Sequence, residues 1–366
     1  MSSVNLKKFV NIDIQKHITA IISGTRDTVV LLTKEGSGDD VIFESYSEAQ
    51  SQLTPASSYQ RTLAYLKIYF DNGGVKCLVH RDSTLIGTSV AEYINNLNNK
   101  YIVIAYAGED TSDIMKYVAQ TREADSSVYG INEKLLITRM TIEDITNESY
   151  SDESIKNLAV KISSQVGAEM TIAAYLSKIN VYGIDSVYDY AFTPEILKEE
   201  DITDTQYDLI IGYNMNVDIE LSNRIRNVGG NCKNGDELTN DYVRIVLHQT
   251  LTDRLLDVLT QKIKDSSGLG KIYTAIVKEL ELYRLNGYLT TDEIWTDETL
   301  TVTDSYGRVY TIIQKGTPLL NGYIINVLPM SSLSQEDKAQ HKTPGIYIIL
   351  ADQYGIRQIT INGEII

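Results

Sequence analysis

The sequence predicts an α/β unit followed by a smaller α+β unit, with an extended strand segment at each end. From residue 28 to residue 140, apolar strand-like runs alternate with helical patterns, which is typical of a mostly parallel sheet. After residue 237, two long amphipathic helical patterns precede several short strands. Both ends of the chain alternate apolar and polar side chains. The expected units are therefore 1–22, 23–236, 237–354 and 355–366.

Short apolar runs mark the expected strands of the α/β unit, at 18–22, 28–32, 75–81, 101–107 and 134–140. Helical spacing of apolar residues marks the segments between them, at 46–70 with an interruption near Pro55, at 93–97 and at 113–122. Helix 46–70 is expected to stop at Asn72-Gly73-Gly74, because glycine after the last turn is a common helix end.

The last third of the α/β unit has weaker patterns. A long helix is expected over 152–174, with an apolar stripe of Ile155, Leu158, Ile162 and Val166. A strand is expected at 207–213. Segment 227–236 is rich in Gly and Asn, so it is expected to be a linker.

The second unit starts with amphipathic helices, expected at 240–264 and 271–286. A hairpin is expected over 300–313, turning at Asp304-Ser305-Tyr306-Gly307, because these residue types favour a turn between two apolar runs. Further strands are expected at 323–327 and 346–350, on either side of a polar segment at 331–342. Two helices packed on a small sheet make this unit α+β.

Composition excludes several classes of partner. The net charge of −16 repels nucleic acid and anionic lipid, so neither is expected to bind. No apolar run is long enough for a membrane span, and the first residues lack the apolar core of a secretory signal.

Cys77 and Cys232 lie far apart and are expected to be reduced, buried thiols. The 25 tyrosines suit extensive interfaces, although a genomic composition bias would give the same excess over phenylalanine.

A search for catalytic chemistry finds no motif. His17, His80, His248 and His341 are scattered and have no zinc-site spacing. No phosphate-binding loop, serine-hydrolase elbow or calcium loop is present. No catalytic residue, metal or cofactor is therefore expected, and the chain is not expected to be an enzyme.

The terminal strands are the candidate functional residues. Apolar side chains alternate at Val10, Ile12 and Ile14 near the start, and the final segment repeats the pattern. An apolar strand edge that stays open is an aggregation hazard, so these segments pair within their own sheet or with a neighbouring copy. The residues expected at such inter-subunit contacts are Val10, Ile12, Ile14, Ile356, Gln358, Ile359, Thr360 and Ile361.

Several segments resemble the contractile tail sheath proteins of bacteriophages and related injection systems. In that family an aromatic pair and Asn-Gly-Gly precede an apolar strand that ends in Arg, as in Tyr69 to Arg81. The two helical patterns after residue 237 and the polar segment Leu333 to Pro344 are also similar, although the family often has Arg where this chain has His341 or Lys342. Segment Tyr354 to Ile361 is similar to the family's final strand, in which Gly-Ala-Ile-His is common; here Ile356 and Arg357 stand in its later part.

This resemblance implies a fold and a mechanism. The first unit would be a subtilisin-like α/β sheath domain without catalytic residues, followed by a small α+β domain with extended arms. Subunits would form stacked hexameric rings of a helical sheath, joined by exchanged terminal strands through β-augmentation. Contraction would drive the tail tube through the host envelope without a nucleotide.

The implied partners are other copies of the chain, the tail tube protein, and the baseplate and tail terminator proteins, with no nucleic acid and no membrane. The implied location is the virion, as part of a phage tail assembled in the host cytoplasm. Two alternatives stay open: another structural tail or baseplate component, and an α/β enzyme whose site depends on His80 or on a dispersed acidic residue.

Overall fold

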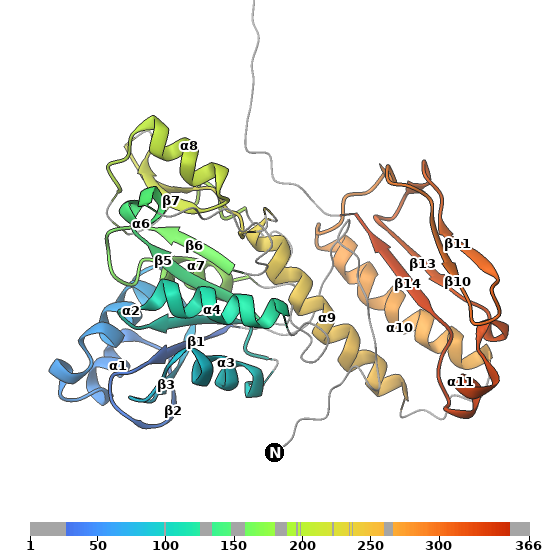
Figure 1. The fold of residues 1–366 in the computed structure, drawn as a ribbon, viewed down its shortest axis with the longest axis horizontal. Helices are drawn as coiled ribbons and strands as arrows, with labels where there is room; N and C mark the ends of the chain where they lie inside the picture. The colour runs from blue at the N-terminus through green and yellow to red at the C-terminus, as the bar shows by residue number, and fades with distance from the viewer. Residues whose placement is uncertain are drawn as a thin grey trace, which may run out of the picture.

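The structure is a computed structural model, and it describes residues 27–351 except 99, 125–133, 148–157, 180–188, 195–196, 198, 222, 234, 236 and 260–265. A large sheet with flanking helices forms one side of the molecule, and a set of small sheets forms the other (Figure 1). Helix α9 (Leu238–Leu259) runs between the two parts (Figure 1).

The large sheet has eight strands in the order β2-β3-β1-β4-β5-β6-β7-β8. Its strands are β1 (Thr28–Thr33), β2 (Gly38–Phe43), β3 (Lys76–Arg81), β4 (Val103–Ala107), β5 (Leu135–Met140), β6 (Leu158–Ile162), β7 (Asn216–Glu220) and β8 (Ile225–Val228). The six inner strands are parallel, and the two edge strands β2 and β8 run antiparallel to their neighbours. The mostly parallel sheet expected from the sequence is confirmed.

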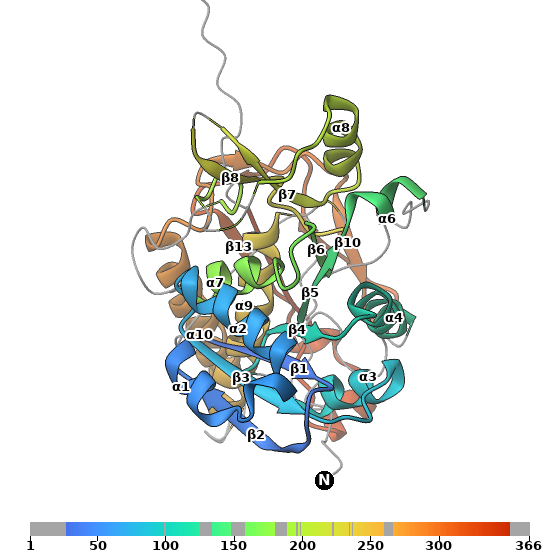
Figure 2. The ribbon, with the colours of Figure 1, turned by 90° about the vertical axis from the view of Figure 1, so that its left-hand side faces the viewer.

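Helices cover both faces of this sheet (Figure 2). They are α1 (Tyr46–Gln52), a 3-10 turn η2 (Ala56–Ser58), α2 (Gln60–Asp71), α3 (Gly87–Asn96), α4 (Thr111–Ala124), α6 (Ile142–Asn147), α7 (Met170–Ser177) and α8 (Asp204–Gly212). Helices α2 and α7 pack on one face, and α3 and α4 on the other. Strand β4 is buried along its whole length, as expected for a parallel strand covered on both sides.

The helix expected over 152–174 is wrong at 158–162, whereas its last residues, 170–174, do lie in a helix. Residues 158–162 form β6, and a helix, α7, begins only at Met170. All five side chains of β6 are buried, whereas a one-sided helical stripe would leave Ala159 and Lys161 in water. An apolar run buried on both faces satisfies helical and strand spacing equally, and its place between β5 and β7 decides for the strand.

One further expectation near the sheet edge is wrong, the strand at 207–213. Residues 207–213 lie in and just after helix α8, which begins after Thr203. The Thr203 hydroxyl accepts a hydrogen bond from the Gln206 amide at 3.3 Å, and the Gln206 side chain accepts one from the Thr203 amide at 2.9 Å. Segment 227–236 begins with the last two residues of strand β8, and its described remainder connects β8 to α9, with Cys232 buried.

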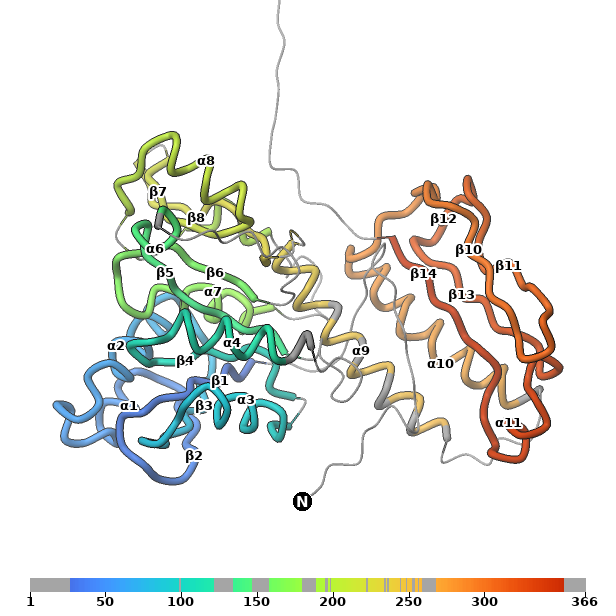
Figure 3. The backbone as a smooth tube through the Cα atoms, viewed as in Figure 1, coloured from blue at the N-terminus to red at the C-terminus, as the bar shows by residue number. Residues whose placement is uncertain are grey.

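The second part contains α10 (Ser266–Leu285) and three two-stranded antiparallel sheets (Figure 3). Its strands are β9 (Glu293–Ile294), β10 (Leu300–Thr303), β11 (Val309–Ile313), β12 (Pro318–Leu319), β13 (Tyr323–Val327) and β14 (Ile346–Leu350), with the 3-10 turn η4 (Met330–Ser332) and the short helix α11 (Gln335–Ala339) before β14. The hairpin expected over 300–313 and the strands at 323–327 and 346–350 are confirmed.

One apolar core runs through both parts of the molecule. It joins one face of the large sheet to the small sheets by way of α9 and α10. Near the start of α9, Tyr242 and Val243 are buried in it, and on α10 Ile276 and Leu280 belong to the same cluster. The second core, on the opposite face of the large sheet, contains Val30, Ile104 and Val118.

Candidate functional site

The carboxyl ends of β1 and β4 meet where open α/β sheets usually bind ligands. An ion pair and a hydrogen bond to the backbone lie at this place. Lys34 Nζ lies 3.5 Å from Asp110 Oδ2, and Arg61 Nη1 donates to the Gly108 carbonyl at 3.0 Å. Lys34 and Asp110 thus pair across the two strand ends, and Arg61 holds the backbone that follows β4.

The N-terminus of α2, beside these strand ends, is occupied by a carboxylate of the chain itself. Glu35 Oε1 accepts a hydrogen bond from the Arg61 amide at 2.9 Å, and Oε2 accepts one from the Thr62 amide at 2.7 Å. A helix N-terminus is the usual anion site of an α/β protein. Here the Glu35 carboxylate already holds the donors that a phosphate would use.

A buried carboxyl lies at the start of α7. Glu169 is fully buried, and neither of its oxygens accepts a hydrogen bond of normal geometry from the described residues. Burial raises the pKa of Glu169 to about 7, and the nearby Tyr65 hydroxyl and Arg139 guanidinium oppose the rise. A fully buried carboxyl does not meet a solute, so we assign Glu169 to stability rather than to catalysis.

His80 lies on β3, the strand next to the edge strand β2 of the large sheet. Its Nδ1 is 2.6 Å from Asp40 Oδ1, and its ring stacks on Tyr93 with 3.8 Å between the ring centroids. The Tyr93 hydroxyl donates to the other Asp40 oxygen at 2.8 Å. The three side chains join β2, β3 and α3, which gives His80 a structural place.

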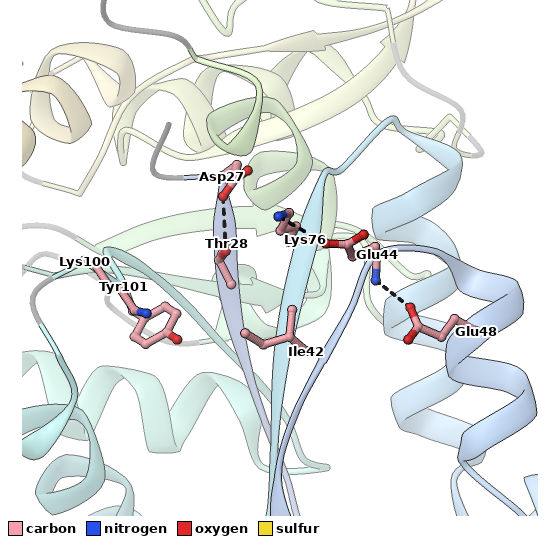
Figure 4. A pocket seen from close by; sticks show the side chains of 8 residues that line it. All are labelled: Asp27, Thr28, Ile42, Glu44, Glu48, Lys76, Lys100 and Tyr101. Carbon is pink, nitrogen blue, oxygen red and sulfur yellow. Dashed lines mark hydrogen bonds and ion pairs between the residues drawn. The ribbon is translucent and has the colours of Figure 1, made fainter. Parts of the chain in front are cut away.

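Two surface cavities adjoin the large sheet. One has a volume of about 610 Å³ and is lined by Asp27, Thr28, Ile42, Glu44, Glu48, Lys76, Lys100 and Tyr101 (Figure 4). Its Lys76 pairs with Glu44 at 3.1 Å. The other, of about 1110 Å³, lies beside β7 and contains Glu200, whose Oε1 accepts hydrogen bonds from the Ser163 hydroxyl and the Ser164 amide. In both cavities the charged groups named here already bind other groups of the chain.

Strands of the small sheets have a single ladder partner among the described residues. Among the described strands, β14 pairs only with β13 and β10 pairs only with β11, so each keeps one edge without a ladder partner. Strand β14 is apolar throughout, with the sequence Ile-Tyr-Ile-Ile-Leu. Val309 and Leu320 in this part are 64% and 65% exposed. These edges are the candidate surface for contacts with other chains.

Asn326 joins two of the small sheets. Its side-chain amide donates to the carbonyls of Thr311 at 3.4 Å and Ile312 at 3.2 Å, so β13 contacts β11 through a side chain. These hydrogen bonds hold the small sheets together without a backbone ladder.

All eight residues expected at inter-subunit strands lie outside the described residues, which begin at 27 and end at 351. Cys77 and Cys232 are both buried, as expected. In the described ranges, no helix is long and apolar enough to cross a membrane, and no group of three or more His, Cys, Asp or Glu side chains is placed to hold a metal ion.

The sequence analysis missed one polar cluster, that of Lys161, Asp218 and Asn227 inside the large sheet. The Lys161 amine lies 2.6 Å from Asp218 Oδ1 and 3.1 Å from Asn227 Oδ1. The signal was a single lysine inside the apolar run Leu-Ala-Val-Lys-Ile. Read as a strand buried on both faces, that run would have required an acidic partner for the lysine.

No family model matches the chain, and no curated protein matches its sequence. Solved structures match it along most of its length. A chain of the anti-feeding prophage baseplate, from a 6-fold symmetrised cryo-EM structure, has a TM-score of 0.62 at 13% identity and covers 100% of this chain and 98% of its own.

A chain of the PVC sheath complex, an extracellular contractile injection system in its contracted state, has a TM-score of 0.60 at 14% identity, covering 97% of this chain and 96% of its own. The sheath tail protein of Desulfitobacterium hafniense has a TM-score of 0.50 at 8% identity, covering 78% of this chain and 91% of its own. The chain thus has the fold of proteins from contractile sheaths, as the sequence resemblance implied.

Proposed function

We propose that this chain is a structural subunit of a contractile sheath. Subunits assemble as stacked hexameric rings around a tube, and contraction drives the tube through the envelope of a target cell. The observation that carries the proposal is the match, over nearly the whole of both chains, to a sheath complex in its contracted state. The 6-fold symmetrised baseplate that contains the other similar chain supports the ring symmetry.

Exchanged terminal strands are the proposed joints between subunits. The segments around Val10 to Ile14 and Ile356 to Ile361 would each add to a sheet of a neighbouring copy. The single-partner edges of β14 and β10 support this, because an added strand would satisfy backbone groups there. Unit 237–354 would then carry the sheets that receive strands from neighbouring copies, and unit 23–236 would form the rest of each subunit.

The proposed partners are other copies of the chain, the tube protein, and the baseplate and terminator proteins at the two ends. The role is structural and needs no cofactor. The protein would reside in the finished particle, a phage tail or a related injection system, after assembly in the cytoplasm of the producing cell.

Electron microscopy of the purified chain tests the proposal. The wild-type protein should form long, hollow, striated tubes. Deletion of Arg357 to Ile366 should leave a folded, soluble subunit that forms none. Normal tubes from the truncated chain would rule out the C-terminal strand as a joint.

Paired substitutions in the same segment make a matched control. Ile359→Asp with Ile361→Asp places two charges on the expected apolar face of the strand, and should block tubes. Gln358→Asp with Thr360→Asp places two charges on the opposite face, and should allow them. Equal loss in both variants would show that strand pairing with a defined face is not the cause.

A second candidate function is a baseplate component, because similar chains come from baseplate structures. Ring formation without helical growth, seen in the same images, would favour this function over the sheath. Both candidate functions use the same exchanged strands. Deletion of Arg357 to Ile366 should therefore prevent assembly in either case, whether the wild-type chain forms tubes or rings.

A further inference from the structure

Three reactive side chains meet inside the large sheet, on adjacent strands. Lys161 lies on β6, Asp218 on β7 and Asn227 on β8, and Asp218 and Asn227 are register partners. Their exposed fractions are 0%, 1% and 0%. Lys161 Nζ lies 2.6 Å from Asp218 Oδ1 and 3.1 Å from Asn227 Oδ1. An amine, a carboxyl and an amide carbonyl are therefore in mutual reach without access to water.

Neighbouring side chains hold the group in place. The Tyr190 hydroxyl lies 3.1 Å from Lys161 Nζ, and the Tyr190 ring centroid lies 5.3 Å from the same atom. Thr171 Oγ1 lies 3.0 Å from the Tyr190 hydroxyl. The Asn227 amide nitrogen donates to the Tyr190 carbonyl at 3.3 Å, so its carbonyl oxygen points toward Lys161. This fixed geometry is the condition under which an intramolecular reaction becomes fast.

We propose that Lys161 and Asn227 join in an intramolecular isopeptide bond, with Asp218 as the proton-transfer group. Removing both charges of the buried Lys161–Asp218 pair relieves its desolvation cost, so the pair can exist as a neutral amine and a carboxylic acid. The neutral amine is the nucleophile. Its target is Asn227 Cγ, the carbon that bears the oxygen 3.1 Å away.

The reaction balances without an added reagent. A bond forms between Lys161 Nζ and Asn227 Cγ, and the bond between Cγ and Nδ2 breaks. One amine proton passes through the Asp218 carboxyl to the leaving nitrogen, which departs as ammonia, and Asp218 ends unchanged. No atom is oxidised or reduced. The product is a secondary amide, and the chain loses one nitrogen and three hydrogens.

The bond would fasten the edge of the sheet. It connects β6 to β8 across β7, between residues 66 positions apart in the sequence. Like a disulfide, such a cross-link limits the freedom of the unfolded chain. Unlike a disulfide, it does not depend on the redox state of the compartment. The strands farthest from β1 would be held covalently in a subunit that transmits force.

Mass spectrometry of the purified full-length wild-type protein is the test. The intact chain should be about 17 Da lighter than its sequence requires, the mass of one ammonia. Trypsin should fail to cut after Lys161, and peptide 227–233 should appear attached to peptide 157–178. Lys134 serves as an internal control, because it is also buried but its amine donates to the Asn98 and Tyr101 backbone carbonyls. It should appear unmodified.

Two variants identify the reacting groups. Asn227→Ala should restore the full sequence mass, and Asp218→Asn should leave Lys161 and Asn227 unjoined. If either variant fails to fold, the peptide map of the wild-type protein still decides. An unmodified Lys161 peptide from folded wild-type protein overturns the proposal. So does a deficit that persists in Asn227→Ala, which would place the ammonia loss at another asparagine, or a loss of about 18 Da mapped to Asp218, which would mean condensation with that carboxyl.

Discussion

The two parts of the molecule differ in how completely their strands are paired. Inner strands of the large sheet have a neighbour on each side, and β4 and β6 are buried along their whole length. In the small sheets every described strand has one ladder partner, and all five residues of β13 are only half-buried. Six strands of the large sheet are paired on both sides within one chain, whereas each described strand of the small sheets keeps an edge at which an added strand would gain hydrogen bonds and burial.

The largest expected difference is in the cost of removing a core side chain from each part. Leu31→Ala, in fully buried β1, should lower the free energy of unfolding by about 3–4 kcal/mol. Ile325→Ala, in half-buried β13, should cost about 1 kcal/mol in the isolated chain. Urea unfolding of the purified chain measures both losses. Equal losses would mean that the small sheets are as complete as the large one.

Glu169 gives the large sheet a pH dependence. Burial raises its pKa to about 7, above the ordinary 4.5, so the folded state holds the proton more tightly than the unfolded state. Stability from this group is full below pH 4.5 and falls as the pH rises to 7, by about 3 kcal/mol in total. Glu169→Gln should remove this fall, so the variant gains relative stability between pH 5 and pH 8.

Urea unfolding at both pH values gives the measurement, and exposed Glu293→Gln is the control. The same pH profile in wild type and Glu169→Gln would contradict the assignment of the pH dependence to this carboxyl.

The smallest expected difference in unfolding free energy between the two parts compares the N-terminus of α2 with a surface ion pair. Glu35→Ala removes the acceptor of two backbone hydrogen bonds and should cost about 1–2 kcal/mol. In the second part, Glu298→Ala breaks an ion pair whose side chains are 92% and 56% exposed, and should have no measurable effect. Thermal unfolding of both variants checks the pair, and a larger effect at Glu298 would reverse the expected order.

Strong local signals made much of the fold predictable from the sequence. The strand expected at 101–107 and the glycine stop after Asn72 both appear, because a short apolar run and a helix end depend on few distant residues. Helix α3 begins at Gly87, six residues before the expected start, since its first turns carry few apolar residues.

The misses occur where distant contacts decide the structure. The run 158–162 fits a helical stripe, and only its neighbours β5 and β7 make it a strand. Its lysine is accommodated by Asp218 and Asn227, which lie 57 and 66 positions along the chain. Helix α8 was predicted as a strand for a different reason. Its local signal, the Thr203 and Gln206 spacing of a capping box, was present in the sequence but was not used.

Asn326 has a consequence for the direction in which the small sheets can widen. Its amide already occupies two carbonyls of β11, so the seam between β11 and β13 is closed to an incoming backbone. A strand from another chain would therefore pair with the outer edge of β14 or β10. It would extend the sheet there without separating β11 from β13. Replacing Asn326 with a residue that has no side-chain amide would free these two carbonyls of β11. An added strand could then also pair between β11 and β13.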